Sequence, residues 1–518
     1  SFAGGVGGAF SKASPARTPS LAFPPHFPSS PGGFMKDRTI AAISTPRGKG
    51  GIAVIRISGD EAISVAELMF RARSGIPLTE QPSNRAVYGD ILYRGEVIDD
   101  GLAVIFRAPH SYTGEDTVEI SCHGGILLAD KVLESAFLSG ASQAEAGEFT
   151  RRAFLSGRLG LSQAEAVIDL IDARSSSQIE LALGTREGRL SESIDELYSR
   201  LSDLISSIYV DIDYPEEGLS GLGEGEAEAR MRGLKSALEA LASTYRLGSA
   251  VGEGIPVCIV GKPNTGKSSL LNLLLGDDRA IVTSVAGTTR DVIEETLTVG
   301  RIMLRISDTA GIRDSENEVE QIGIERSKKK LSGAQLCLAV FDGSRPADEE
   351  DAELLRLLEG FKARGGELLT VVNKLDLCEN IQAVNDPCEG DAPENTLPDI
   401  PIKPFLSENA DLLGAPVCIS AATGAGKQAL LDRITALYDD GKIDLRGDAV
   451  VSNSRQYADI CTAVHHIDEA LSSLAVGMTE DVAGTDLELA LSALGSVDGR
   501  TVTEDVVNGI FSRFCVGK

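Results

Sequence analysis

The sequence predicts a chain of several domains, in which an α+β domain precedes a helical domain that is interrupted by an inserted α/β domain. Three observations lead to this fold class. The length of 518 residues is several times the usual size of one domain. Short apolar runs dominate the first part, and apolar residues at helical spacing follow. In the middle, apolar strands alternate with helical segments, which favours a mostly parallel sheet covered on both faces.

Residues 1–34 are expected to lie outside any packed domain. The first 36 residues contain no Asp or Glu, although the chain has 77 acidic residues. Such a segment could be a transit peptide for a mitochondrion or plastid. It could equally be a leader before a true start near Met35 of a cytoplasmic, bacterial-type protein. Both interpretations stay open.

Residues 35–152 are predicted to form the compact α+β domain. Its strand signals are the runs IAVIRIS (52–58) and LAVIFRA (102–108), with Gly and Pro between them. Helical stretches are interspersed with these runs, which indicates a mixed domain.

Residues 153–252 and 443–518 are predicted to be the two parts of one helical domain. Leu161, Ala164 and Val167 recur at three-residue steps, and similar spacing continues beyond them. This period is typical of long amphipathic helices that pack against one another.

The inserted α/β domain is predicted to span residues 253–442. Within it, the segment at about 379–416 is acidic and rich in Pro. This composition favours a mobile surface insertion.

Composition excludes several classes of function. The formal net charge is −28, which argues against a broad, sequence-independent grip on nucleic acid, because phosphate neutralisation needs clustered Lys and Arg. No apolar run is long enough to cross a bilayer, so no membrane role is expected. The eight cysteines form no C-x-x-C pair, so zinc ribbons and disulfide frameworks are not expected.

The run VCIVGKPNTGKSSLLNLLL (257–275) carries the strongest motif, a strand followed by G-x-x-x-x-G-K-S and a helix. Gly261 and Gly266 let backbone N–H groups wrap phosphates at a helix N-terminus. Lys267 can reach the outer phosphates, and the Ser268 hydroxyl can coordinate Mg²⁺.

Two further motifs follow downstream. In IMLRISDTAG (302–311), Asp308 is placed to hold magnesium through its shell, and Gly311 can offer its N–H to the terminal phosphate. In AGTTRD (286–291), Thr289 can supply a second hydroxyl to Mg²⁺. Because that ligation depends on the terminal phosphate, the segment is predicted to be a switch.

Base selection is predicted at NKLD (373–376). The Asp376 carboxylate can accept hydrogen bonds from the ring nitrogen and exocyclic amine of guanine, which adenine lacks. CISAA (418–422) suits backbone contact to the guanine oxygen. The motifs follow predicted strands, where ligands bind in open α/β sheets, so the sequence predicts a Ras-like P-loop GTPase domain. The predicted GTP-binding residues are Asn264, Thr265, Gly266, Lys267, Ser268, Ser269, Thr283, Ser284, Val285, Ala286, Gly287, Thr288, Thr289, Asp308, Thr309, Ala310, Gly311, Asn373, Lys374, Leu375, Asp376, Ser420, Ala421 and Ala422.

Ile312 follows Gly311 where many small GTPases carry a Gln that orients water. A hydrophobic side chain cannot do this, so hydrolysis needs another carboxylate or amide and an extra cation. The acidic run DSENEVE (314–320) offers candidates, although it could also be a solvated switch region.

The order of these features resembles one family, the MnmE (TrmE) tRNA-modification GTPases. GEFTRRAFLSGRLGLSQAEAVIDLIDA (147–173) and the terminal CVGK carry the resemblance, which runs from about Met35 to Lys518 and is interrupted mainly near 379–416. The resemblance implies that K⁺ replaces an arginine finger and that the G domains of a homodimer meet face to face. The positions matching the potassium ligands are Asn264, Thr283, Val285 and Thr288. Glu320 matches the catalytic residue that positions the water.

The resemblance also implies that the N-terminal domain is folate-binding-like and holds a 5,10-methylenetetrahydrofolate-type cofactor at a dimer interface. The matching positions are Arg56, Glu119, Arg158 and Lys518. Many relatives have Lys where this chain has Arg158.

The implied reaction adds a carboxymethylaminomethyl-type or taurinomethyl group at C5 of the wobble uridine of tRNA. An FAD-containing partner of the MnmG or GidA type is implied, in a heterotetramer. The alternative is a regulatory GTPase switch or ribosome-assembly factor without folate chemistry. His123 and Cys515 invite a catalytic interpretation, but a structural histidine near a Gly turn and a simply buried cysteine are favoured.

Overall fold

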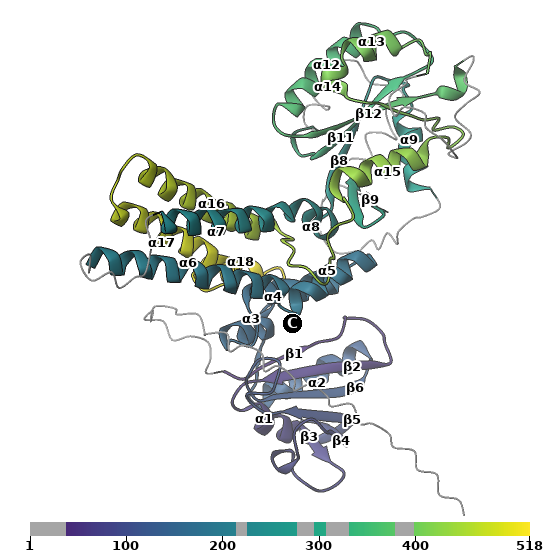
Figure 1. The fold of residues 1–518 in the computed structure, drawn as a ribbon. Helices are drawn as coiled ribbons and strands as arrows, with labels where there is room; N and C mark the ends of the chain where they lie inside the picture. The colour runs from purple at the N-terminus through teal and green to yellow at the C-terminus, as the bar shows by residue number, and fades with distance from the viewer. Residues whose placement is uncertain (1–37, 214–224, 277–294, 307–330, 379–397, 518) are drawn as a thin grey trace, which may run out of the picture. The chain divides into compact units, whose positions relative to one another are not determined.

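The computed structural model describes residues 38–213, 225–276, 295–306, 331–378 and 398–517 (Figure 1). The described residues form two compact units, one of residues 38–164 and 498–517 and the other of the described residues between 165 and 497. No helix among the described residues is long and apolar enough to cross a membrane.

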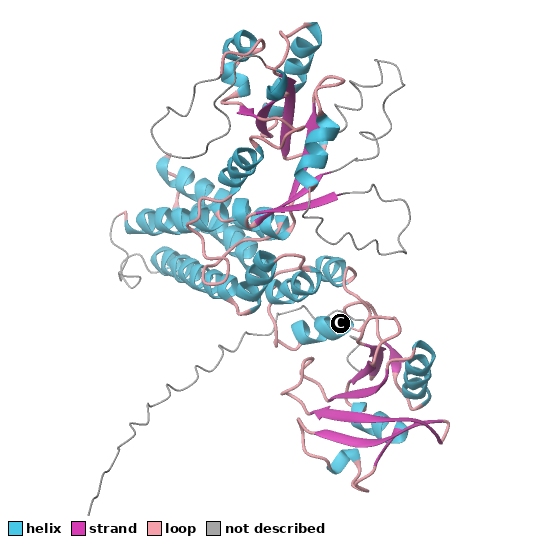
Figure 2. Cartoon of the chain, turned by 90° about the vertical axis from the view of Figure 1, so that its right-hand side faces the viewer, coloured by secondary structure: helices cyan, strands magenta, loops and turns pink. Residues whose placement is uncertain are grey.

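The first unit contains a seven-stranded sheet in the order β3-β4-β5-β6-β2-β1-β7, with its strands in magenta in Figure 2. All neighbouring strands run antiparallel except β1 and β7. The strands are β1 (Ile40–Ile43), β2 (Ile52–Ser58), β3 (Phe70–Ala72), β4 (Ala86–Tyr93), β5 (Glu96–Phe106), β6 (Thr117–His123) and β7 (Ser142–Gln143). Both predicted strand runs therefore lie in this sheet.

Two helices, α1 (Ala62–Met69) and α2 (Ile126–Leu138), share a core with alternate residues of the central strands, such as Ile55, Ile57 and Ile120. The intervening residues of these strands point to the opposite face, because successive side chains of a strand alternate. A 3₁₀ turn, η2 (Leu78–Glu80), follows β3.

The end of the chain belongs to this first unit. Helix α18 (Glu504–Phe511) packs against α3 (Glu148–Leu155), and Phe511 lies against Phe154 with ring centroids 6.2 Å apart. A β-bridge joins Val516 to Ala146, and Ser44 Oγ donates to the carbonyl of Gly517 over 3.1 Å. The C-terminal segment is thus anchored beside β1. Cys515 in this segment is exposed, so the expectation of a simply buried cysteine is wrong.

The second unit contains a helical bundle. Its helices are α5 (Ser176–Arg186), α6 (Arg189–Asp213), α7 (Glu226–Ser243), α8 (Tyr245–Gly252), α16 (Ser454–Ala475) and α17 (Glu480–Val497), and α4 (Leu161–Asp172) precedes them. Leu197, Leu201 and Leu204 are buried along one face of α6, where they meet apolar residues of α7, α16 and α17. The predicted amphipathic helices are confirmed.

The second unit also contains a six-stranded sheet in the order β13-β12-β11-β8-β10-β9, in which β9 alone among the described strands runs antiparallel to its neighbour. The strands are β8 (Ile255–Val260), β9 (Glu295–Val299), β10 (Ile302–Ile306), β11 (Leu336–Asp342), β12 (Glu367–Asn373) and β13 (Val417–Cys418). Helices α9 (Lys267–Leu275), α12 (Glu349–Lys362) and α15 (Lys427–Tyr438) flank it. Along β8, Val257 and Ile259 enter one core while Cys258 and Val260 enter another. The sheet is therefore covered on both faces, as predicted.

The expectation of a mobile surface insertion at 379–416 is wrong for its described part, residues 398–416. These residues form α13 (Lys403–Glu408) and α14 (Ala410–Leu413). Ile400, Ile402, Leu406 and Leu413 are buried in the core that includes α12. The prediction rested on the acidic and Pro-rich composition of the whole segment and gave these few apolar residues too little weight. Proline also does not prevent α13, because it lies in the first turn of the helix, where it is well tolerated. Residues 379–397 lie outside the described part.

Candidate functional site

The phosphate loop joins β8 to α9. Its glycines are required because neighbouring atoms lie too close to the loop backbone to leave room for a Cβ atom. A Cβ on Gly266 would lie 2.2 Å from Nδ2 of Asn373, and one on Gly261 would lie 2.4 Å from the carbonyl oxygen of Val340. Gly266 has φ +90°, which favours glycine, and Asn264 also adopts a left-handed conformation with φ +63°. The loop therefore turns sharply and delivers the N-terminus of α9 to a ligand.

The loop is wound around the carbonyl of Lys262. This oxygen accepts hydrogen bonds from Nζ of Lys267 over 2.6 Å and from Oγ1 of Thr265 over 3.0 Å. Thr265 is fully buried. The backbone N–H groups at the start of α9, together with the Lys267 ammonium, provide the positive potential that a phosphate needs.

Asn373, at the end of β12, links the phosphate loop to the base-selecting loop. Its Nδ2 donates to the carbonyl of Thr265 over 2.9 Å, and its Oδ1 accepts from the N–H of Ala421 over 2.9 Å. Asn373 is only 1% exposed. Three segments that are far apart in the sequence thus meet at one buried side chain.

Asp376 lies in the short 3₁₀ turn η3 (Leu375–Leu377) that follows β12. Its Oδ1 accepts a hydrogen bond from Oγ of Ser420 over 2.5 Å, and the residue is exposed. One carboxylate oxygen is therefore held in place while the group remains open to a ligand.

Lys374 is left-handed with φ +67° and forms an ion pair with Asp342 at the end of β11, where Nζ and Oδ2 are 2.8 Å apart. Burial of Asp342 opposes its ionisation, but hydrogen bonds from Lys374 and Ser344 outweigh this effect and hold its pKa below the usual value. Asp342 was not singled out in the sequence. Its position at the carboxyl end of a predicted parallel strand could have identified it, because ligands bind at this edge of an open α/β sheet.

The structure thus brings together the described members of the predicted nucleotide site. These are Asn264, Thr265, Gly266, Lys267, Ser268, Ser269, Asn373, Lys374, Leu375, Asp376, Ser420, Ala421 and Ala422. Residues 283–289 and 308–311, with Glu320, lie outside the described residues, so their predicted roles stay predictions.

Two of the predicted folate residues are direct neighbours on the first sheet. Arg56 of β2 is paired with Glu119 of β6, and both Nε and Nη2 of Arg56 lie 2.8 Å from Oε1 of Glu119. The guanidinium carbon lies 5.5 Å from the ring centroid of Tyr112 and 5.6 Å from that of Phe149. Arg158 is exposed after α3, and its side chain lies beside Gly114. Lys518 lies outside the described residues.

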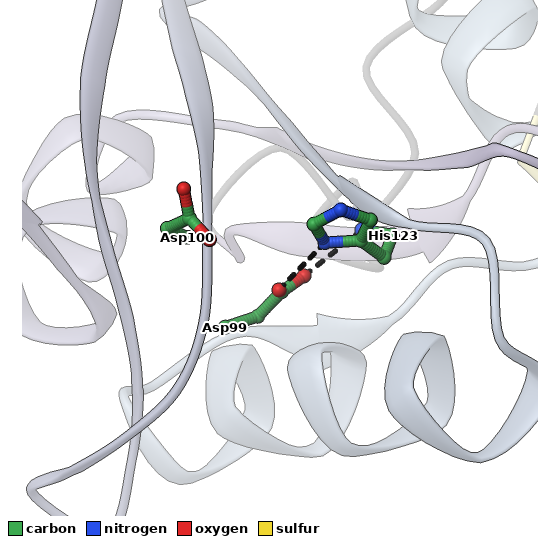
Figure 3. A group of neighbouring side chains, drawn as sticks. All are labelled: Asp99, Asp100 and His123. Carbon is green, nitrogen blue, oxygen red and sulfur yellow. Dashed lines mark hydrogen bonds and ion pairs between the residues drawn. The ribbon is translucent and has the colours of Figure 1, made fainter.

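Among the described residues, Asp99, Asp100 and His123 offer ligand atoms within 4.8 Å of one another and have the chemistry to hold a metal ion (Figure 3). Asp99 accepts from the backbone N–H of His123 over 2.9 Å, and its other oxygen lies 2.8 Å from Nδ1 of the same histidine. Asp100 accepts a hydrogen bond from the hydroxyl of Tyr88. Both oxygens of Asp99 thus contact His123 at the end of β6. The exposed histidine therefore has a structural role in this contact.

The Asp99→Asn substitution is expected to lower the pKa of His123. The hydrogen bond to the Asp99 carboxylate raises the pKa of His123 above its ordinary value. A raised pKa in the folded state stabilises the fold below the unfolded-state pKa of about 6.5, and this contribution disappears as the pH rises through the folded-state pKa. NMR titration of the imidazole measures the midpoint, and the stability difference from wild type should shrink at alkaline pH. Asp60→Asn, at the opposite end of β2, is the control; an unchanged midpoint in Asp99→Asn contradicts the assignment.

Comparisons with known proteins cover nearly the whole chain. Residues 39–158 match the family described as GTP-binding protein TrmE N-terminus, and residues 161–515 match the MnmE helical domain. A protein of Clostridioides difficile named tRNA modification GTPase MnmE is 40% identical over 482 residues, which are 93% of this chain and 99% of that protein. The protein of the same name from Thermotoga maritima is 39% identical over 93% of this chain and its entire length.

A solved structure of Aquifex aeolicus Era bound to GDP and aluminium fluoride aligns with 41% of this chain and 66% of that chain, at 25% identity and a TM-score of 0.25. The family matches and the full-length relatives, together with the joined phosphate and base-selecting loops, identify a GTP-hydrolysing enzyme. The chain belongs to the MnmE family of tRNA modification GTPases.

Proposed function

We propose that this enzyme is a potassium-stimulated GTPase that acts on tRNA with an FAD-containing partner of the MnmG or GidA type. The reaction would add a carboxymethylaminomethyl-type or taurinomethyl group at C5 of the wobble uridine. The observation that carries the proposal is the assembled nucleotide site, in which Asn373 joins the phosphate loop to the loop of Ser420 and Ala421, within a chain related over its length to tRNA modification GTPases.

In the GTPase domain, assigned to residues 253–442, Lys267 and the N-terminus of α9 would bind the phosphates. Ser268 and Thr289 would bind Mg²⁺, which neutralises developing negative charge on the phosphates. Asn264 would contribute its amide oxygen to K⁺, along with oxygens of Thr283, Val285 and Thr288. The left-handed turn at Asn264 supports this role, because it places an oxygen-bearing side chain at the bend of the loop. Glu320 would position the attacking water.

In the N-terminal domain, assigned to residues 35–152, Arg56 and Glu119 would contact the folate, with Arg158 and Lys518 from the following segments. The side chains of Arg56 and Glu119 are 18% and 28% exposed, so the pair is accessible and preorganised. The positively charged guanidinium of Arg56 lies beside the rings of Tyr112 and Phe149, and the negatively charged carboxylate of Glu119 is its partner. This combination suits a flat ligand with polar edges. The folate would supply the one-carbon unit.

A homodimer through the sheet of the N-terminal domain is part of this proposal. The sheet face opposite α1 and α2 carries Ile52, Tyr88 and Leu102, which are 66%, 46% and 42% exposed. Exposed apolar residues gathered on one face are typical of an interface. Arg56 and Glu119 lie on the same face by strand alternation, so a second copy that packs on this face would lie beside the proposed folate site.

The net charge of −28 supports a complex in which the partner contributes most of the basic surface that binds tRNA, because binding of phosphates needs Lys and Arg. GTP hydrolysis would then drive the conformational cycle that orders the joint active site.

GTP turnover by the full chain is expected to be at least about tenfold faster in potassium than in sodium at matched ionic strength, because K⁺ would stabilise charge in the transition state. Asn264→Ala should lose this stimulation. Asn272→Ala, an exposed asparagine of α9, should keep it. Equal turnover of the wild-type enzyme in the two salts would overturn the potassium mechanism and leave GTP hydrolysis without an identified activating cation.

A further inference from the structure

The second residue of the phosphate loop, Lys262, is held by two carboxylates from the distant helix α12. Its side chain is only 3% exposed. Nζ lies 2.5 Å from Oδ2 of Asp351 and 2.7 Å from Oδ2 of Asp348. The side chain of Asp351 is 2% exposed, so this half of the contact is withdrawn from water.

Burial alone would discharge a lysine, because an ammonium is costly to remove from water. Burial of Lys262 lowers its pKa, but hydrogen bonds to Asp348 and Asp351 outweigh this effect and raise the pKa above its ordinary value. The pKa of Asp348 is lowered by the hydrogen bond from Lys262. The contact is therefore an ion pair at neutral pH, and removing one partner leaves a buried charge without compensation.

The two carboxylates are themselves fixed by the first turn of α12. Asp348 is the N-cap, and its Oδ1 accepts from the N–H of Glu350 over 3.0 Å. Oδ2 of Asp351 accepts from the N–H of Asp348 over 3.0 Å, which completes a capping box. The helix N-terminus also favours negative charge. The carboxylates that hold Lys262 thus have little freedom to move.

On the other side, the backbone of Lys262 organises the phosphate loop. Its carbonyl accepts from Lys267 Nζ and from the buried Thr265 hydroxyl. A single residue therefore connects the first turn of α12 through its side chain to the phosphate-binding lysine through its carbonyl.

We propose that Asp348 and Asp351 are positioning residues for GTP hydrolysis, which act through Lys262 to set the shape of the phosphate loop. Their side chains contact Lys262 and the first turn of α12. Their effect is to fix the direction of the Lys262 carbonyl and, with it, the place of Lys267 and the backbone N–H groups of the loop. The catalytic efficiency of the enzyme then depends on a carboxylate, that of Asp351, which lies 89 residues away from Lys262 along the chain.

The test separates positioning from stability with four variants of the full chain. Lys262→Met leaves Asp351 without its cation, and Asp351→Asn leaves Lys262 with only the half-exposed Asp348. Lys262→Met combined with Asp351→Asn removes both buried charges, which restores much of the stability, because the damage from a broken pair comes largely from the group left behind. Lys262→Arg keeps the charge and the ion pair.

We expect Lys262→Met, Asp351→Asn and the double variant to lower kcat/KM for GTP and to weaken binding of a fluorescent GDP analogue. The expected losses are about 10- to 100-fold, since small misplacements at a reacting centre have effects of this size. The thermal midpoint of the double variant should lie closer to wild type than that of Lys262→Met. Lys262→Arg should recover most of the affinity.

The matched control is Leu358→Ala in α12, which removes a fully buried side chain from the same helix without touching the ion pair. It should lower the thermal midpoint but leave GDP affinity within about twofold of wild type, provided the helix stays folded. Wild-type affinity and kcat/KM in the double variant would overturn the proposal, even if Lys262→Met itself fails to fold. Equal losses of affinity in Leu358→Ala would also overturn it, because α12 would then act through general stability.

Discussion

Asp376→Asn is expected to change the preference for GTP over XTP by about 100-fold. Guanine presents a ring N–H and an exocyclic amine, both of which can donate to the Asp376 carboxylate. An asparagine can accept only one of them and turns its own N–H₂ towards the other. Xanthine carries a carbonyl in place of the amine, so it would accept from that N–H₂ group.

The size of this effect follows from hydrogen bonds to a charged group, which contribute about 1.5–3 kcal/mol each. One such bond lost by GTP and one gained by XTP give about tenfold in each direction. Ser420 should hold the new side chain as it holds Asp376, because its hydroxyl contacts Oδ1 and Asn retains that atom.

Competition of GTP and XTP against a fluorescent GDP analogue measures the two affinities. Asp411→Asn, on the exposed surface of α14, is the matched control and should leave the preference unchanged. An unaltered GTP to XTP ratio in Asp376→Asn would show that this carboxylate does not contact the base.

The architecture of the nucleotide site was predictable because its signals are local. The strand, loop and helix of residues 257–275 appear in order in the sequence, and strand ends in a parallel sheet meet at one edge. That rule is sufficient to bring Asn373 near the phosphate loop. The amphipathic spacing along α6 likewise predicted the bundle, because the period of buried leucines is a property of one helix.

The remaining features depend on pairing between segments, which local periodicity does not encode. The partner of Lys262 lies in the first turn of α12, and nothing near Lys262 distinguishes it from a solvated lysine. The helices α13 and α14 were missed for a different reason, since average composition outweighed the few apolar residues, Ile400, Ile402 and Leu406, that enter the core. Whether a side chain is buried depends on its position in the fold, whereas the composition of a segment gives only an average over all its residues.

Arg152→Met is expected to destabilise the first unit by about 3–5 kcal/mol, the range typical for removing one partner of a buried ion pair. The Arg152 side chain is 7% exposed and lies between two carboxylates. Nη1 is 2.9 Å from Oε2 of Glu115, and Nη2 is 2.8 Å from Oε1 of Glu148. Nη2 also donates to the carbonyl of Arg38 over 3.1 Å.

Methionine approximates the length of the aliphatic part of arginine, so the loss comes mainly from two buried carboxylates that are left with less compensation. The side chain of Glu148 is 6% exposed and that of Glu115 is 12% exposed, so water cannot replace the guanidinium fully. Arg38 still contacts Glu148 over 3.3 Å, which limits the damage on that side. Among the residues that the structure describes, only the hydroxyl of Ser58 still contacts the Glu115 carboxylate. Glu115 is therefore the centre of the expected instability.

Hydrogen exchange of the amides of β2 and β6, followed by mass spectrometry, reports the opening of this unit separately from the second one. Exchange in these strands should accelerate by two or more orders of magnitude, since each 1.4 kcal/mol corresponds to about tenfold. Arg230→Met, which breaks an exposed ion pair with Glu226 on α7, should cost less than about 1 kcal/mol and leave β2 and β6 unaffected. If Arg152→Met leaves exchange in β2 and β6 as slow as Arg230→Met does, the two carboxylates do not depend on the guanidinium. The ion-pair network would then contribute little to the stability of this unit.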